Sequence, residues 1–176
     1  MSQKWKKLDM IISAICDGKK VGLSTFQEGM LDFIKMNGIL PISFSHFGVV
    51  VKNINSYIEW LSKVIEEITE LNINKDQVAS YNVYIARFKL DDIELELIEP
   101  YGESFFMEYL NEHGNCLHHI SYQVRDIENS ILKLSKSKDT VELIDLKPRS
   151  GSHGKVAFMK PVFSKPMCLE LCQNQG

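Results

Sequence analysis

The chain has 176 residues, a length that fits one ordinary domain or two small modules that share a core. Hydrophobic residues make up 44% and charged residues 24%, as in soluble globular proteins. The net charge of -3 removes the bulk electrostatic reason to expect nucleic acid binding. No signal segment and no membrane-spanning apolar run is recognised in the sequence. The four cysteines form no CxxC pair, so we expect a cytoplasmic protein with reduced, structural thiols.

Residues 1–40 predict a helical N-terminal extension. Apolar residues between Trp5 and Ile15 recur at helical spacing. Ser24 followed by Gln27 resembles a capping box that would open a second helix, and Gly38 is typical of its end. The simplest interpretation is a pair of helices packed on the domain surface. The alternative is a role in dimerisation or in docking a partner.

The first module spans about residues 43–102. Its expected order is a strand, a helix and two further strands, placed near 46–51, 54–69, 81–90 and 93–98. Asp91-Asp92 between the last two strands is a tight hairpin signal. A connecting helix is predicted from Phe105 to His113, ending at Gly114.

The second module, about 115–174, repeats this plan. Its strand, helix and three further strands are expected near 118–124, 127–137, 141–145, 155–160 and 167–172. The sequence therefore predicts an α+β domain over residues 43–174, built from two βαβββ modules.

The two modules also share a sequence repeat. The segment 45–54 reappears as the segment 118–127, which matches His46 with His119. Each module then closes on a strand that carries a glutamate, Glu96 in the first and Glu170 in the second. The separation of histidine and glutamate agrees within one residue. Modules related by pseudo-twofold symmetry would bring both histidines and both carboxylates to one metal ion.

Imidazole and carboxylate groups suit zinc, nickel, cobalt, manganese or iron(II). The candidate metal ligands are His46, Glu96, His119 and Glu170. Four ligands leave positions open on an octahedral ion, as a catalytic metal needs in order to bind a substrate oxygen.

Two positions of this set have close competitors. Glu94 and Glu96 share one face of their strand, and a one-residue insertion in the second module aligns Glu170 with Glu96. His118 and His119 are adjacent and point to opposite faces; the repeat selects His119 and leaves His118 as a supporting or structural residue.

These residues resemble the vicinal oxygen chelate superfamily, which includes the glyoxalases and bleomycin resistance proteins, and within it most closely the methylmalonyl-CoA epimerases. The resemblance covers about residues 43–174 and leaves 1–40 outside. The resembling segments are 45–51, 93–100, 117–121, 147–159 and 169–173. The resemblance implies paired βαβββ modules that form a cup-shaped mixed β-sheet around a divalent metal, and a homodimer.

The resemblance implies chemistry next to a carbonyl. A metal would polarise the carbonyl, a carboxylate would remove the adjacent proton, and an enediolate would form. A methylmalonyl-CoA epimerase-like isomerase acting on an acyl-CoA thioester is the first hypothesis. A glyoxalase I-like lyase (lactoylglutathione lyase type) acting on a thiol conjugate is the second, and a non-catalytic small-molecule-binding or resistance protein the third.

An epimerase needs two acid/base groups, one on each face of the carbon. Glu170 is one candidate. The strand at 81–90 contains no carboxylate, so Glu94, a water or a tyrosine would have to supply the second group, or the reaction differs.

The loop 147–155 combines three cations with two glycines and contains no acid. Glycine amides can approach an anion closely, and the cations could meet the phosphates of coenzyme A. The alternative is a solvated hairpin loop. The candidate substrate-binding residues are Arg149, Ser150, Gly151, His153 and Lys155.

Overall fold

The computed structural model describes residues 3–19, 22–64, 76–90, 93–151 and 154–174. The chain forms two compact units. The module-one unit contains residues 2–21 and 48–117, and the module-two unit contains residues 22–47 and 118–176. The first strand, β1 (Ser43–Val50), begins in the module-two unit and ends in the module-one unit.

The module-one unit has a β-sheet with strand order β2-β3-β4-β1. The strands β2 (Asp76–Val78), β3 (Val83–Leu90) and β4 (Ile93–Pro100) pair antiparallel, with Arg87 opposite Glu96. The helices are α1 (Gln3–Ile15), α3 (Ile54–Val64) and α4 (Phe105–His113). Leu95, Glu96 and Leu97 are all buried, so β4 is covered on both of its faces.

The module-two unit has the strand order β1-β5-β9-β8-β6, with the short β7 on β8. The strands β5 (Cys116–Gln123) and β9 (Cys168–Asn174) pair parallel, whereas the pairs within β6 (Val141–Leu143), β7 (Arg149–Ser150), β8 (Gly154–Pro161) and β9 are antiparallel. The sheet is therefore mixed.

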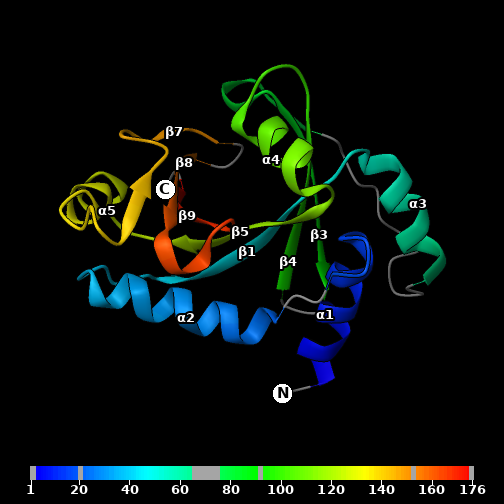
Figure 1. Ribbon diagram of the computed structural model, residues 1–176, viewed down its shortest axis with the longest axis horizontal. Helices are drawn as coiled ribbons and strands as arrows, with labels where there is room; N and C mark the ends of the chain where they lie inside the picture. Colours follow the sequence, from blue (N-terminus) through cyan, green and yellow to red (C-terminus); the bar gives the residue numbers. More distant parts are fainter. Residues whose placement is uncertain (1–2, 20–21, 65–75, 91–92, 152–153, 175–176) are drawn as a thin grey trace. The chain divides into compact units, whose positions relative to one another are not determined.

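Two helices pack in this unit (Figure 1). The helix α5 (Ile127–Leu134) lies against β8 and β9. The helix α2 (Leu23–Met36) is joined to β5 by the Tyr122 hydroxyl, which donates to the carbonyl of Gln27 at 2.9 Å. Apolar side chains of α2 are buried because its periodicity places them on one face: Leu23, Met30, Phe33 and Ile34.

Each module has its own internal helix cap, and the two caps match. The carboxylate of Glu99 accepts from the backbone N–H of Ile54 at 2.8 Å, at the first residue of α3. The side-chain oxygen of Gln173 accepts from the backbone N–H of Ile127 at 2.9 Å, at the first residue of α5. The last strand of each module therefore holds the helix of the same module by satisfying a backbone donor that the helix leaves open.

The βαβββ plan is present in both modules, with some differences from the sequence prediction. Neither β2 nor β7 was expected, because two or three residues give no periodicity. The predicted capping box is wrong, since α2 starts at Leu23 and has Gly22 as its N-cap, which places Ser24 inside the helix. The predicted hairpin turn at residues 91–92 and the helix beyond residue 64 lie outside the described residues.

The N-terminal extension contains both predicted helices, but α1 belongs to the module-one unit and α2 to the module-two unit. Ile11, Ile12 and Ile15 of α1 are buried. The extension is thus divided between the two units and packs into both. None of the described helices combines the length and the apolar character needed to cross a membrane.

Candidate metal centre

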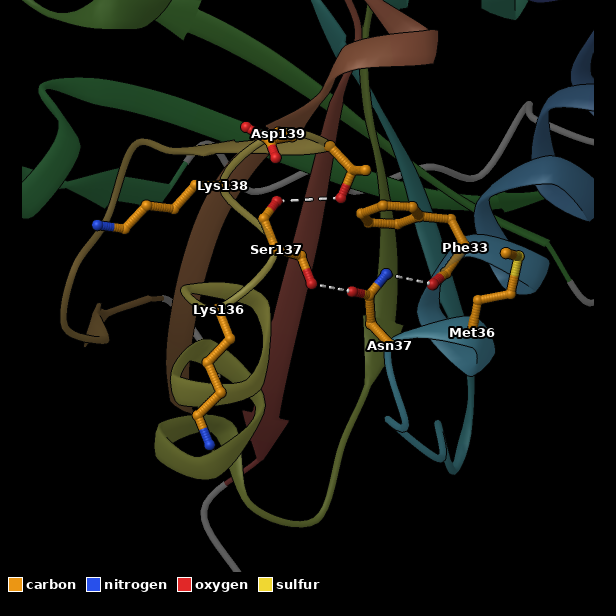
Figure 2. Close-up of a pocket in the computed structure, with 8 residues that line it drawn as sticks. Phe33, Met36, Asn37, Lys136, Ser137, Lys138 and Asp139 are labelled. Atoms are coloured by element: carbon orange, nitrogen blue, oxygen red, sulfur yellow. Dashed lines mark hydrogen bonds between the residues drawn. The ribbon is translucent and has the colours of Figure 1, made fainter.

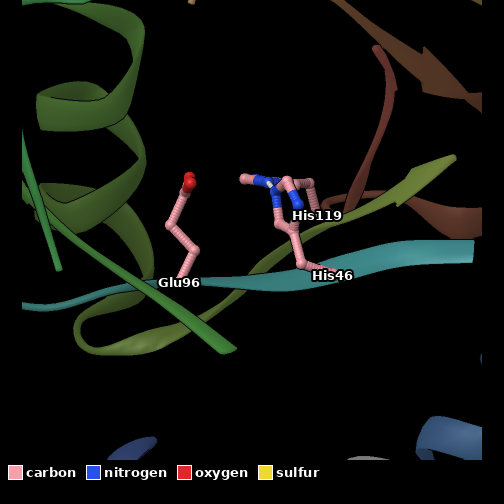
Figure 3. A group of neighbouring side chains, drawn as sticks. All are labelled: His46, Glu96 and His119. Carbon is pink, nitrogen blue, oxygen red and sulfur yellow. Dashed lines mark hydrogen bonds between the residues drawn. The ribbon is translucent and has the colours of Figure 1, made fainter. Parts of the chain in front are cut away.

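Two buried histidines of the module-two unit lie next to each other (Figure 3). His46 projects from β1 and His119 from β5, its neighbour in the strand order. Their Nε2 atoms are 3.2 Å apart, and the ring planes cross at 78°. His119 is fully buried and His46 is 5% exposed. The two Nε2 atoms therefore face one another away from bulk water.

The carboxylate of Glu170 reaches the same point from β9. The parallel register sets Glu170 opposite Ser121 of β5, and the Ser121 hydroxyl donates to Glu170 Oε1 at 2.5 Å. Oε1 lies 3.5 Å from Nε2 of His46, and Oε2 lies 3.9 Å from Nε2 of His119. Donor groups on three adjacent strands thus form a triangle, in which a different oxygen of Glu170 faces each histidine.

This triangle fits a transition-metal ion. Two ligands that each lie about 2.1 Å from one ion are about 3.0–3.4 Å apart in octahedral or tetrahedral geometry. The two Nε2 atoms, 3.2 Å apart, lie within that range, and one oxygen of Glu170 lies 3.5 Å from the first of them and the other oxygen 3.9 Å from the second. Neutral imidazole with carboxylate is also the ligand chemistry of zinc, nickel, cobalt, manganese and iron(II). His46, His119 and Glu170 could therefore hold such an ion.

The remote nitrogens of both histidines have hydrogen-bond partners. Nδ1 of His46 lies 3.0 Å from the Ser45 hydroxyl. Nδ1 of His119 lies 3.0 Å from Nδ1 of His118. Contacts of this kind orient a ligating ring and select its tautomer. The contact with Ser45 was not predicted from the sequence, whereas His118 was expected to be a supporting or structural residue.

Glu96, in the module-one unit, has a different environment. Its carboxylate accepts a hydrogen bond from the guanidinium of Arg87, which is directly opposite on β3. The Arg87 Nε also lies 3.6 Å from the carboxylate of Glu94. The Glu96 side chain is 4% exposed and that of Glu94 is 29% exposed. Arg87 therefore offsets the charge of both carboxylates that the sequence singled out in this module.

The backbone confirms the alignment that pairs Glu96 with Glu170. The N–H of Val51 donates to the carbonyl of Ile98, and the N–H of Val124 donates to the carbonyl of Cys172, both at 2.8 Å. Glu96 stands two residues before Ile98, and Glu170 stands two residues before Cys172. The one-residue insertion inferred from the sequence is therefore real, and the two glutamates occupy equivalent strand positions.

The candidate substrate-binding loop is bonded to acidic residues of its own unit. Arg149 Nε lies 2.7 Å from Asp145, whose other oxygen accepts from the backbone N–H of Phe158. Lys155 pairs with Glu128 at 2.5 Å. These acids were not anticipated, because Asp145 precedes the loop and Glu128 lies on α5.

The other members of the predicted loop site are mainly in the hairpin backbone. The N–H of Gly151 donates to the carbonyl of Gly154 at 2.7 Å, and Ser150 pairs with Lys155 between β7 and β8. His153 lies outside the described residues. Binding of substrate by this loop stays a prediction.

The pKa values of three described thiols are shifted, and that of Cys16 is raised, mainly by its hydrogen bond to Cys116. Burial raises the pKa of the Cys168 thiol to about 12, so that this thiol is protonated at neutral pH. A hydrogen bond from Cys16 lowers the pKa of Cys116 to about 6, and the nearby Lys19 acts in the same direction. Cys168 is therefore a neutral neighbour of the candidate centre.

A pocket of about 300 Å³ lies in the module-two unit, where the end of α2 meets the turn after α5 (Figure 2). Asn37 donates to the carbonyl of Phe33 at 2.9 Å and accepts from the Ser137 hydroxyl at 2.6 Å. The lining contains none of the predicted site residues: Phe33, Met36, Asn37, Lys136, Ser137, Lys138, Asp139 and Thr140. The side-chain amide of Asn37 therefore joins the end of α2 to the turn after α5.

A family model described as the Glyoxalase/Bleomycin resistance protein/Dioxygenase superfamily matches residues 45–158. The chain belongs to this superfamily. It is also 30% identical over 133 residues to the Uncharacterized protein YqjC of Bacillus subtilis (strain 168), a match that covers 74% of this chain and 91% of that protein. The glyoxalase superfamily assignment confirms the resemblance found in the sequence.

Solved structures agree with this assignment at the level of the fold. Methylmalonyl-CoA epimerase of Streptomyces coelicolor, in a complex with 2-nitronate-propionyl-CoA, has a TM-score of 0.66 at 18% identity and covers 78% of this chain and 97% of its own. The epimerase of Mycobacterium tuberculosis gives 0.64 at 17%, covering 80% and 96%. A hypothetical protein from Bacillus halodurans C-125 gives 0.63 at 24%, covering 76% and 95%. These likenesses confirm the α+β glyoxalase fold class.

Proposed function

We propose that the protein is a metal-dependent enzyme that removes a proton next to a carbonyl, most simply a methylmalonyl-CoA epimerase-like isomerase acting on an acyl-CoA thioester. The observation that carries this proposal is the buried cluster of His46, His119 and Glu170, in which the two Nε2 atoms are 3.2 Å apart and each faces one oxygen of Glu170, at 3.5 Å and 3.9 Å. The fourth ligand in the proposal is Glu96, the repeat equivalent of Glu170.

A bound divalent metal would supply Lewis-acid polarisation of the substrate carbonyl, worth several kcal/mol of charge stabilisation. The side chains of this protein would then handle the proton. Ser121 holds Oε1 of Glu170 through its hydroxyl, so the carboxylate has a fixed orientation in which it can accept a proton. The buried position excludes water from this transfer, which strengthens each electrostatic contact.

The second acid/base group in the proposal is Glu94. It lies two residues before Glu96 on the same face of β4, and its side chain is accessible to solvent. Arg87 contacts Glu94 and Glu96 together, so a proton gained or lost by one of them changes how strongly the guanidinium binds the other. This coupling gives the first module a means of returning the proton.

The acyl-CoA substrate is supported by the fold neighbours, since the epimerase structures include complexes with methylmalonyl-CoA and with 2-nitronate-propionyl-CoA. In the proposal Arg149 and Lys155 exchange their present carboxylate partners for phosphates, assisted by Ser150, Gly151 and His153. We also propose, from the family resemblance, that the enzyme is a cytoplasmic homodimer; light scattering of the purified protein measures its oligomeric state.

Deuterium exchange at C2 of methylmalonyl-CoA in heavy water, followed by NMR, tests the reaction. The wild-type protein loaded with metal should exchange this position, and Glu170→Gln should abolish the exchange. Glu142→Gln is the matched control, because Glu142 is an exposed strand carboxylate paired with Lys165. Full exchange by Glu170→Gln would contradict the proposed role of this residue.

A glyoxalase I-like lyase is the second candidate, because the two-histidine, two-glutamate set that the repeat defines resembles the nickel-type glyoxalases equally well. Turnover of a hemithioacetal without exchange at C2 of methylmalonyl-CoA would favour it. Stoichiometric metal retained by His46→Ala, His119→Ala and Glu170→Ala alike would refute the metal centre and leave the non-catalytic binding protein as the alternative.

A further inference from the structure

His118 is a fully buried histidine to which the proposed reaction gives no task. It stands on β5 directly before His119, and its Nδ1 lies 3.0 Å from the Nδ1 of His119. Its ring also meets Phe158 at a centroid distance of 5.9 Å and an interplanar angle of 70°. A polar ring in such a position is retained only if its nitrogens have partners.

Only one hydrogen fits between the two Nδ1 atoms, so one ring donates and the other accepts. If His119 donates, its Nε2 carries a lone pair directed at His46 and Glu170. If His118 donates, the Nε2 of neutral His119 carries the hydrogen and cannot bind a metal. The direction of this single hydrogen bond therefore decides whether His119 can act as a ligand.

The contacts of Cys168 with His118 and Pro166 indicate which of the two histidines donates. The Nε2 of His118 lies 3.8 Å from the Sγ of Cys168, and this Sγ lies 3.9 Å from the carbonyl oxygen of Pro166. A carbonyl oxygen only accepts, so in a hydrogen bond between these two atoms the S–H is the donor. The sulfur then accepts from N–H at Nε2 of His118. A neutral His118 with its hydrogen on Nε2 must accept at Nδ1.

We propose that His118 is a positioning residue that, with Cys168 behind it, holds His119 in the tautomer whose Nε2 lone pair faces the metal position. The hydrogen bonds are all donated in one direction, from His119 to His118, from His118 to Cys168, and from Cys168 to the carbonyl of Pro166. The inference rests on the proposed metal centre, and it gives His118 a function that no substrate contact requires.

Two variants of similar size separate this role from simple packing. His118→Asn keeps an acceptor oxygen near the place of Nδ1, whereas His118→Leu removes it. Zinc affinity, measured by competition with a chromophoric chelator, should fall roughly 10–100-fold in His118→Leu, the usual effect of losing an outer partner of a ligating histidine. It should stay near the wild-type value in His118→Asn.

The tautomer itself can be observed without activity. In metal-free protein labelled with ¹⁵N-histidine, NMR should show His119 protonated at Nδ1 in the wild type and in His118→Asn, and a mixture of tautomers in His118→Leu. Hydrogen on Nε2 of His119 in the wild type would overturn the inference. So would a His118→Leu variant with unchanged zinc affinity and tautomer.

A second pair of variants covers the case in which His118→Leu does not fold. Cys168→Ser keeps an acceptor for the N–H of His118 and Cys168→Ala does not, so only Cys168→Ala should weaken zinc binding and broaden the His119 tautomer signals. Equal behaviour of these two variants would count against the inference. A wild-type protein that binds none of zinc, nickel, cobalt, manganese or iron(II) would instead refute the proposed function. The tautomer of His119 is measured without metal, so it tests the inference separately.

Discussion

Glu96 and Glu170 occupy equivalent positions in the two modules, yet their surroundings differ. Glu96 is bonded to the guanidinium of Arg87, a permanent cation, whereas the contacts described for Glu170 include the Ser121 hydroxyl and two imidazoles. A buried carboxylate is costly without a compensating cation. The repeat therefore reproduces the backbone position of the two glutamates, while the neighbours described for each carboxylate differ in charge. In the proposed metal centre, the ion would supply the cation near Glu170.

The largest expected effect is on metal binding when this second carboxylate is neutralised. Glu170→Gln should reduce zinc affinity by more than the roughly 100-fold that loss of an outer contact causes, because it removes the charge that faces both histidines. Glu96→Gln should reduce it less, since Arg87 already offsets that charge. Chelator competition on both variants measures the difference, with Glu142→Gln as control. Equal losses would show that the two modules contribute alike.

Removing Arg87 tests how much its guanidinium stabilises the carboxylates of the first module. Arg87→Met leaves Glu94 and the buried Glu96 without their guanidinium, and we expect the free energy of unfolding of the metal-free protein to fall by about 2 kcal/mol, since the Arg87 side chain is 18% exposed. Urea unfolding measures this change. Lys165→Met, which breaks an exposed pair, should cost less than about 1 kcal/mol.

Adding zinc to Arg87→Met and to the wild type tests whether Glu96 is a metal ligand. If Glu96 is a metal ligand, the added ion replaces the lost cation, so metal should recover more stability in Arg87→Met than in the wild type. A variant whose urea midpoint responds to zinc no more than the wild type would argue against Glu96 as a ligand.

The helix caps offer a test in which the two modules should behave alike. Glu99→Ala and Gln173→Ala each remove the acceptor for the first backbone N–H of a helix, and each should lower the free energy of unfolding by about 1 kcal/mol. Urea unfolding checks both. A clear difference between them would mean that the matched contacts do not have matched energies.

The smallest expected effect concerns thiol reactivity. The thiolate is the reactive form, so Cys116, with its pKa lowered to about 6 by Cys16, should already react with iodoacetamide at pH 7 at close to its maximal rate. Cys168, with its pKa raised to about 12 by burial, should remain unlabelled in the folded protein. Peptide mass spectrometry after labelling between pH 5 and 9 measures both. Labelling of Cys168 at the rate of Cys116 would contradict the difference.

The sequence alone predicted most of the fold and the residues that come together in the module-two unit. The repeat was sufficient because a two-residue period fixes the face of each side chain on a strand. It also aligned Glu170 with Glu96 correctly, as the matched backbone bonds of Val51 and Val124 show. The assignment of these residues as metal ligands stays a prediction.

Part of what the sequence did not reveal depends on register between distant strands. Ser121 meets Glu170 only because β5 and β9, which are distant in the sequence, lie parallel with those residues opposite. A single strand contains no information on its partner's offset. The contact of Arg87 with Glu96, in contrast, follows from the two-residue hairpin predicted at residues 91–92, and the sequence analysis did not extend that register along the two strands. The partner of Arg149 was missed for a different reason, since Asp145 lies only four residues before it but no motif in the sequence singled it out.

The cap of each module and its proposed ligand are three residues apart on one strand: Glu99 with Glu96, and Gln173 with Glu170. A slip of either strand by one residue would therefore cause two faults together. It would turn a leucine toward the place of the carboxylate, and it would release the backbone donor at the start of the helix. Each helix cap forms only when its strand is in the correct register. A chain in which both helices are capped therefore also has both glutamates in their native positions.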